Sequence, residues 1–192
     1  NFTFTEFNDR KIPVWSINPQ LTIHENFRIE FYFVPVHRGS ELPGNGAVWQ
    51  NPVSQTVSDH FVGLGITNLN YQKVDNKLHN ASHGARAFIK AFGADFAISY
   101  YNGYAHSPHA IVNTSTSTVD FKYARVRMYS LDTEFPLFGL VWRGEIAYFH
   151  KGKFYETAPN YSSVEKKYLA VVFGFDKNDL FTKGFYLNIQ YI

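Results

Sequence analysis

The chain has 192 residues, contains no cysteine and carries a formal net charge of +2 at pH 7. The lack of cysteine excludes a disulfide scaffold, a thiolate metal site and a cysteine nucleophile, and so small a charge does not favour nucleic-acid binding. Aromatic residues make up 18% of the chain, yet the mean hydropathy is only -0.25. Strands that face lipid on one side and water on the other combine these two properties.

The dominant pattern along the chain is an alternation of apolar and polar residues with a period of two, which is typical of β-strands. It is clearest in residues 27–33, where large apolar side chains alternate with Arg28, Glu30 and Tyr32. The pattern predicts about eight antiparallel strands, each about long enough to cross a bilayer at a tilt. In chain order they cover residues 14–23, 27–33, 84–92, 95–104, 118–129, 138–148, 167–177 and 185–191.

Two of these segments are less regular than the others. Pro19 lies in the first segment and favours an edge strand or a bulge there. In the fifth segment, Arg125 and Arg127 share a face with Phe121 and Tyr123, which makes it the weakest of the predicted strands. The sequence shows no convincing α-helical periodicity, and no apolar run is long enough for a membrane-spanning helix.

Successive side chains of a strand point to opposite faces, so each strand is expected to have an apolar and a polar side. The apolar side is expected to carry Phe27, Ile29, Phe31, Phe138, Leu140, Trp142, Ile146, Tyr148, Phe173, Phe185, Leu187 and Ile189. The candidate functional residues are the charges on the other side, namely Arg28, Glu30, Arg86, Lys90, Arg143 and Glu145. Such charges either set the solute preference of a lumen or only satisfy one another across strands.

The connections between the predicted strands differ in length. Residues 24–26, 93–94 and 178–183 are short turns, whereas residues 36–83, 105–117 and 151–166 form long polar connections. A further connection of intermediate length, 130–137, contains Asp132 and Pro136. Short and long connections alternate, as periplasmic turns and extracellular loops do in outer-membrane barrels. We therefore expect the long connections to lie together on the extracellular side, with mobile tips.

The same alternation has a consequence for the two ends of the chain. The strand before the turn at 24–26 must descend to the periplasm, and the last strand, after the turn at 178–183, must ascend. Both ends then stop at the extracellular surface, whereas a complete barrel normally has both on the periplasmic side. We therefore expect residues 1–192 to be one barrel domain that is a fragment of a longer barrel, in which further strands cover the edges.

A soluble β-sandwich or a lipocalin-like barrel also alternates and is the main alternative, as a secreted binding module. The bulk of the apolar residues favours the membrane, since eight strands' worth of large aromatics would overfill a small barrel interior. Aromatic residues near the strand ends would then form the interfacial girdles. They are Trp15, Tyr100, Tyr101, Tyr104, Tyr148 and Tyr191.

Other chemistry has weaker support. The histidine pairs His79 with His83 and His106 with His109 fall in expected loops without a cluster of carboxylates, so solvated histidines are expected rather than a metal site. An outer-membrane lipid hydrolase would need a serine and histidine together, and Ser99, Ser130 and His150 are available, but no Gly-x-Ser-x-Gly motif occurs. Four Asn-x-Ser/Thr triplets, starting at Asn1, Asn80, Asn113 and Asn160, are the best support for a secreted module.

Short motifs over most of the chain resemble a proteobacterial outer-membrane β-barrel family that is catalogued as a domain of unknown function and grouped with porins. They lie at residues 84–86, 92–96, 99–104, 142–148, 172–177 and 187–192, and at Phe33-Val34-Pro35 with Leu42-Pro43 and Trp49. The resemblance implies an antiparallel transmembrane β-barrel in the outer membrane. It brings no catalytic residues with it.

The sequence thus predicts an all-β outer-membrane protein of porin type that passes small solutes through a polar lumen in a Gram-negative cell. No enzyme activity, cofactor or metal is expected. The expected partners are outer-membrane lipid and small solutes, with a homo-oligomer and a larger envelope assembly as alternatives for protein partners. Because the six candidate charges have mixed signs, strong selectivity for anions or for cations is not expected.

Overall fold

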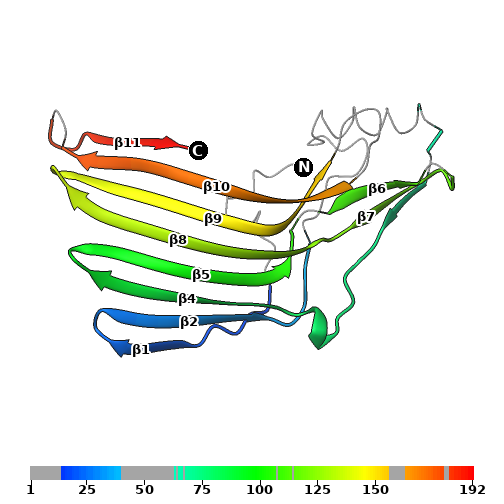
Figure 1. Ribbon diagram of the computed structural model, residues 1–192, viewed down its shortest axis with the longest axis horizontal. Coiled ribbons are helices and arrows are strands. Elements are labelled where there is room, and N and C mark those ends of the chain that lie inside the picture. Colours follow the sequence, from blue (N-terminus) through cyan, green and yellow to red (C-terminus); the bar gives the residue numbers. More distant parts are fainter. Residues whose placement is uncertain are drawn as a thin grey trace, which may run out of the picture.

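The computed structural model is dominated by one large antiparallel sheet (Figure 1). It describes residues 14–39, 63, 65–66, 68–106, 108–113, 115–155, 163–179 and 182–192. The strands of the large sheet, in the order in which they pair, are β1 (Gln20–His24), β2 (Phe27–Val34), β4 (Ser82–Ala91), β5 (Ala94–Tyr104), β8 (Arg125–Leu137), β9 (Leu140–Tyr155), β10 (Ser163–Asn178) and β11 (Tyr186–Tyr191). The chain is therefore all-β and mostly antiparallel, as the alternation predicts.

The four hairpin turns of this sheet lie at one end of the strands, on the left of Figure 1. Two are tight two-residue turns, Phe92-Gly93 and Phe138-Gly139, in which all four residues have positive φ. This backbone is that of a type I′ turn, whose twist matches the flanking strands, and glycine adopts it without steric cost. Phe138 was predicted on a strand face, and this was wrong, because it is a turn residue whose side chain is 86% exposed.

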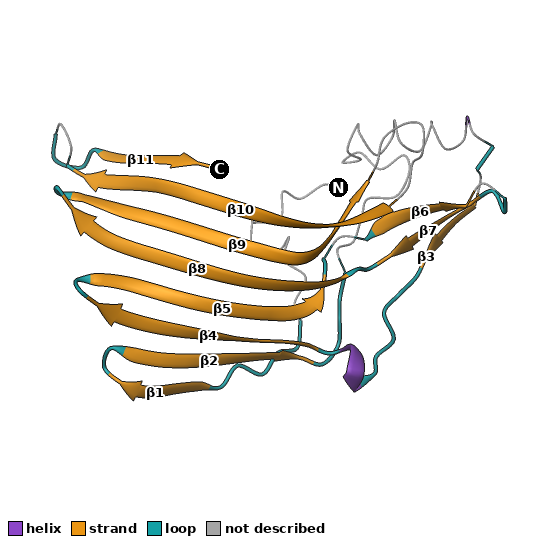
Figure 2. Ribbon diagram, viewed as in Figure 1, coloured by secondary structure: helices purple, strands orange, loops and turns teal. Residues whose placement is uncertain are grey.

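A second sheet of three strands lies beyond the opposite ends of the large sheet's strands (Figure 2). Its order is β3 (Asn68–Tyr71), β7 (Thr118–Lys122) and β6 (His109–Asn113), and β3 runs parallel to β7. A short 3-10 helix, η2 (Leu78–Asn80), follows β3. The small core of this three-stranded sheet is formed by the buried residues Ile66, just before β3, and Val119 of β7. Two predicted long connections, 36–83 and 105–117, therefore contain strands that the sequence did not indicate.

The predicted fifth strand was wrong in its bounds. Residues 118–129 divide between β7 and β8, because the chain passes from one sheet to the other at Tyr123–Ala124. Residues 130–137, predicted as a connection, form the second half of β8. Pro136 is tolerated there because it lies beyond the last pair between β5 and β8, Asp95 with Glu134, so no β5 residue needs its missing N–H.

Two other strands have bounds that differ from the prediction. β9 and β10 are each 16 residues long and extend into the segment predicted as the loop 151–166. Of that loop, residues 156–162 lie outside the described residues. The first predicted strand begins only at Gln20, although Ile17 forms an isolated bridge with Phe33. As Pro19 predicts, β1 is an edge strand, and its register with β2 shifts between Thr22 and His24.

The register of the large sheet separates two faces. A continuous row of aliphatic residues crosses seven strands, each residue paired with the next: Leu21, Ile29, Ala87, Ile98, Leu131, Ile146 and Val171. We call the face that carries this row the apolar face and the opposite one the polar face. Five members of the row are between 45% and 55% exposed, so about half of the surface of each remains uncovered.

Among the described residues no pairing closes the large sheet, whose edges are β1 and β11 (Figure 1). The closed barrel that the sequence predicts is therefore not observed in the strand pairings. No described helix is long and apolar enough to cross a membrane. The buried apolar residues of the large sheet are only small ones, such as Ala97 and Ala147.

Candidate functional site: the polar face of the large sheet

All six candidate residues of the sequence lie on the polar face. Glu30 is paired with Arg86 across β2 and β4, and each residue two positions along the same strand shares its face. The same register places Arg143 and Glu145 of β9 on this face, since they are paired with Glu134 and Asp132 of β8. The two-residue period of the strands is therefore sufficient to bring these charges together.

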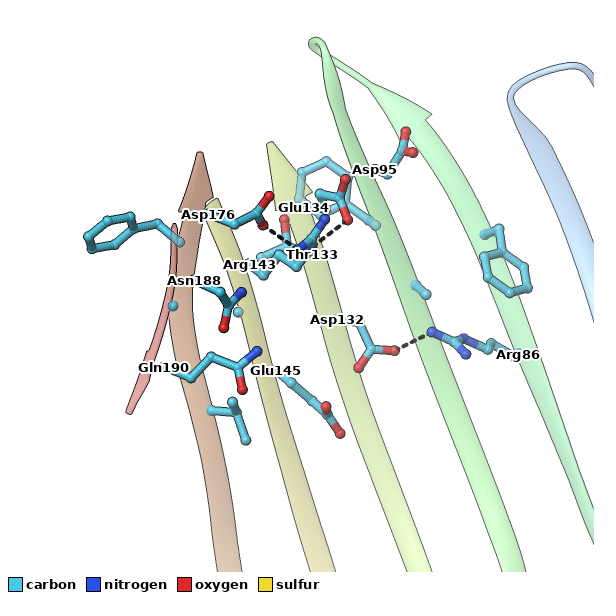
Figure 3. Close-up of a pocket in the computed structure, with 17 residues that line it drawn as sticks. Arg86, Asp95, Asp132, Thr133, Glu134, Arg143, Glu145, Asp176, Asn188 and Gln190 are labelled. Atoms are coloured by element: carbon cyan, nitrogen blue, oxygen red, sulfur yellow. Dashed lines mark hydrogen bonds and ion pairs between the residues drawn. The ribbon is translucent and has the colours of Figure 1, made fainter. Parts of the chain in front are cut away.

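Arg143 is the centre of the densest ionic cluster on the polar face. Its Nε donates a hydrogen bond to Oε2 of Glu134 at 2.9 Å, and its Nη1 donates to Oδ1 of Asp176 (Figure 3). The Asp176 side chain is only 8% exposed, whereas Arg143 and Glu134 are about half exposed. One guanidinium thus joins β8, β9 and β10 and compensates a buried carboxylate, which would be costly without a partner.

Arg86 spans a strand to reach its partner. Its Nη2 donates to Oδ2 of Asp132 at 2.8 Å, although β5 lies between β4 and β8 (Figure 3). Ala97 of β5, which is paired with Asp132, is small enough to let the guanidinium pass over the sheet. Because the strands bring side chains of one face to the same level, a single pair links three strands.

Phe88 is an aromatic residue on this otherwise polar face, and the structure explains its position. The guanidinium carbons of Arg28 and Arg86 lie 4.4 Å and 4.7 Å from its ring centre, within the range of cation–π attraction. Arg28 also pairs with the buried Glu30 at 3.2 Å, and the Tyr32 hydroxyl donates to the same carboxylate at 2.7 Å. These five side chains form a compact group at one side of the polar face.

Lys90 and Glu145 are less constrained than the other candidates. Lys90 pairs with Asp95 at 3.6 Å near a hairpin turn, where both side chains are largely exposed. Glu145 is exposed and stands directly opposite Asp132, a like charge. Opposed like charges weaken a strand pair, and within the described residues no ion pair compensates Glu145. Among the described carboxylates named on this face, it is therefore the one without an ion-pair partner.

The polar face is hollowed between β4 and β11 by a cavity of about 440 Å³. Five carboxylates and two guanidiniums line it, together with the side-chain amides of Asn188 and Gln190 from β11 (Figure 3). This size is within the range of sites for small molecules. Its lining offers hydrogen-bond donors and acceptors and has an excess of negative charge, so water and polar solutes can occupy it.

Several of these residues were not predicted from the sequence. Asp132 and Glu134 were assigned to the connection 130–137, which also contains Pro136, although Leu131, Thr133 and Phe135 alternate with them. That alternation was the signal that could have found them. Asp176, Asn188 and Gln190 also lie on polar positions of predicted strands. Nothing in the sequence indicates that Arg86 reaches Asp132.

The apolar face carries a band of tyrosines beside the aliphatic row. Tyr100, Tyr129 and Tyr148 are paired in register across β5, β8 and β9, with ring centres 5.2 Å and 6.5 Å apart. Tyr101 was predicted in the same girdle, and this was wrong, since it lies on the polar face opposite Gly84. Trp15 is exposed but precedes β1.

The residues considered for other chemistry do not come together in the described part of the chain. Ser99 and Ser130 are paired on the polar face, whereas the ring of His150 lies near Tyr148 on the apolar face. Among the described residues no group of three or more potential ligands could hold a metal ion. His83 and His109 were expected in loops, and this was wrong, since His83 is the second residue of β4 and His109 begins β6.

The asparagines of two of the four Asn-x-Ser/Thr triplets lie in the described residues. The Asn80 side chain donates to the Asp75 carbonyl and accepts from the Tyr104 hydroxyl, and Asn113 accepts from the residues of the following turn. Both asparagines are therefore used in local structure. Asn1 and Asn160 lie outside the described residues.

A family model described as Protein of unknown function (DUF1302) matches residues 3–182 of the chain. No curated protein and no solved structure matches the chain. The matched range contains every charged residue of the polar face named above, and its description attaches no activity to them.

Proposed function

We propose that this chain, which belongs to the family described as Protein of unknown function (DUF1302), is a porin-like outer-membrane protein. In this proposal the large sheet is part of the wall of a transmembrane β-barrel in a bacterial outer membrane. The apolar face lies against lipid, and the polar face lines a lumen through which small polar solutes pass.

The observation that carries the proposal is the aliphatic row, which is continuous over seven strands and in which five of the seven residues are about half exposed. A soluble protein rarely leaves so large an apolar surface in water, because burying it is the main driving force of folding. The opposite face carries paired charges and the cavity. Lipid-facing and lumen-facing residues alternate in this way in transmembrane barrels.

The extent of the apolar face supports the same reading. On β8 it runs from Tyr129 to Leu137 at the hairpin turn, which is about 27 Å along a strand at the usual rise per residue. A strand tilt of about 40° reduces this to roughly 20 Å across the membrane, close to the apolar band of such barrels. Tyr100, Tyr129 and Tyr148 then lie at one interface and Trp142 near the other.

The soluble alternatives need the opposite arrangement. A lipocalin-like barrel or a sandwich would bury the apolar face in its interior, next to the core of the protein. In this chain the hollowed face is the one with Arg86, Asp132 and Arg143. Closing the sheet around that face gives a wet interior, as in porins, instead of an apolar binding pocket.

Cell fractionation and electrophoresis test the membrane part of the proposal. The protein is expected in the outer-membrane fraction, and the unheated folded form is expected to migrate differently from the boiled form on a denaturing gel. Recovery in the soluble periplasmic fraction, with no heat-dependent migration, would contradict the proposal.

A planar bilayer tests the pore. Purified protein is expected to produce discrete conductance steps. We expect Glu145→Gln to change the ratio of cation to anion permeability, since its carboxylate faces the cavity without an ion-pair partner in the described residues. Gln is the matched choice because it preserves shape. A correctly inserted protein without conductance would mean a closed or structural barrel and would overturn the transport function.

A further inference from the structure

Basic residues gather just beyond the tyrosine band, at the strand ends opposite the hairpin turns. Arg127 of β8 is exposed and lies on the apolar face, two positions from Tyr129. In the described residues it makes no ion pair or hydrogen bond, in contrast to Arg86 and Arg143 of the polar face. Arg127 is therefore an exposed cation next to the tyrosine band, and its charge is not compensated by any described residue.

β9 and β10 add lysines at the same level through a bulge. Phe149 is paired with Tyr168 and Gly152 with Lys166, so His150 and Lys151 stand together opposite Lys167. The Tyr168 ring stacks on Phe149, a residue of the polar face, at 4.5 Å. Because neighbours on a strand alternate, Lys167 points to the other side, that of the apolar face.

Further along the strands, Lys151 and Lys153 both pair with Glu165, at 3.7 Å and 3.1 Å. Lys151 and Lys153 therefore share one carboxylate, and neither Arg127 nor Lys167 forms an ion pair within the described residues. We call Arg127, Lys151, Lys153 and Lys167 the basic collar. Its net charge is positive even after the Glu165 pairs are counted. The register beyond the bulge places Lys151, Lys153 and Lys167 on the side of the aliphatic row, with Lys153 also near His109 of β6.

The geometry points to an anionic lipid as the partner: we infer that the basic collar binds the phosphate groups of a phosphorylated membrane lipid. The inference rests on the proposed function, in which the apolar face meets acyl chains and the tyrosine band lies at the interface. A lipid with its chains on the aliphatic row then has its headgroup at the level of Arg127 and Lys167. Lysine and arginine there attract phosphate electrostatically.

The opposite end of the apolar face lacks such a group. Near the hairpin turns the apolar face carries the aromatic Trp142 and one lysine, Lys177, which is paired with Leu187, and Lys183 lies in the turn after β10. The apolar face thus has more basic residues at the end opposite the hairpin turns. With the long connections outside, the collar faces the outer leaflet, where a glycolipid with two phosphates fits it.

The test uses folded full-length protein in a neutral detergent, titrated with lipid A that carries two phosphates. The double variant Arg127→Gln/Lys167→Gln is expected to weaken binding about thirtyfold, because each basic residue at a headgroup contributes roughly fivefold. The matched control Lys177→Gln/Lys183→Gln removes two charges at the other end and is expected to bind within twofold of the unchanged protein. The charge-preserving Arg127→Lys/Lys167→Arg variant is expected to retain binding.

Two further arms separate the sources of phosphate. Dephosphorylated lipid A is expected to bind no better to the unchanged protein than to the double variant, and inorganic phosphate is expected not to compete at millimolar concentration. Equal loss in both Gln variants, or full competition by free phosphate, would overturn the inference. Protein that does not enter lipid vesicles at all would contradict the proposed function, whereas inserted protein with unchanged lipid A binding in the double variant contradicts this inference alone.

Discussion

At the scale of single residues, the charges of the polar face differ in how far their neighbours compensate them. Asp176 is buried and depends on Arg143, whereas Lys90 and Asp95 are both exposed. Solvent screens the exposed pair, and such pairs contribute little to stability. The cost of losing a cation should therefore follow the burial of the carboxylate it leaves behind.

Arg143→Met tests this dependence. It leaves Asp176 without its cation, and we expect it to lower the free energy of unfolding by about 1–2 kcal/mol, with part of the effect screened because Arg143 is itself half exposed. Lys90→Met is the control and is expected to change it by less than about 0.5 kcal/mol. Urea titration of the detergent-folded protein measures both. Equal losses would show that burial of the carboxylate does not matter.

The two faces can be compared by placing the same charge on neighbouring residues of β9. Ile146→Arg puts a cation in the aliphatic row and is expected to cost about 2–4 kcal/mol if the row meets the middle of the membrane. Glu145→Arg places it on the polar face next to Asp132 and is expected to cost much less. Folding into lipid vesicles at graded urea concentrations gives the two values. A larger cost for Glu145→Arg would invert the proposed facing.

At the scale of the elements, the small sheet contains a group whose charge depends on pH. Burial lowers the pKa of His109 in β6, and the positive charges of Lys153 and Lys122 lower that pKa further. Nδ1 of His109 is buried and has no hydrogen-bond partner. A histidine whose folded pKa is below its unfolded value binds protons more readily when unfolded, so its contribution favours the folded state only at higher pH.

Hydrogen exchange of the β6 and β7 amides should report how the stability of the small sheet depends on pH. Protection is expected to be complete above the ordinary histidine pKa near 6.5 and to decrease as the pH falls through that value. His109→Gln should remove much of the decrease, while the amides of β8 and β9 should show little pH dependence in either protein. A pH-dependent loss that persists in His109→Gln would assign it to another group.

The elements also show where sequence reasoning succeeds and where it fails. Period-two alternation located the eight large-sheet strands along the chain and predicted the face of each candidate charge, because the strand period alone determines which residues share a face. It missed the boundary at Tyr123–Ala124, since two strands of different sheets there join without a turn signal. It also assigned 130–137, with Pro136, to a connection, whereas a proline fits in a strand where no neighbouring strand needs its N–H. The three-stranded sheet rests on long-range pairing between β3 and β7, which local patterns do not contain.

At the scale of the whole molecule, the hairpin turns and the small sheet mark two opposite ends (Figure 2). The proposed function assigns the turn end to the periplasm and the small-sheet end to the cell exterior. Because the sequence has no cysteine, a single introduced thiol can report the side of the membrane without background. Ser115 lies in the turn between β6 and β7, and Phe138 lies in the turn between β8 and β9.

Ser115→Cys is expected to react with a membrane-impermeant maleimide on intact cells. Phe138→Cys is expected to react only after the outer membrane is permeabilised, although its side chain position is 86% exposed in the structure. Mass spectrometry of the labelled protein measures both. The reverse pattern would invert the orientation, and labelling of both sites on intact cells would contradict a membrane-spanning sheet.

The way in which the hairpins follow one another along the chain also has a kinetic consequence. β8 and β9 are joined by two residues, whereas residues 35–81 separate β2 from β4. Closing the longer segment loses more chain entropy, and pairings between distant segments form more slowly than local ones. During refolding, amides shared by β8 and β9 should therefore become protected from exchange before those shared by β2 and β4. Until that late pairing forms, β4 is an open edge, so the refolding chain is most exposed to aggregation at β4.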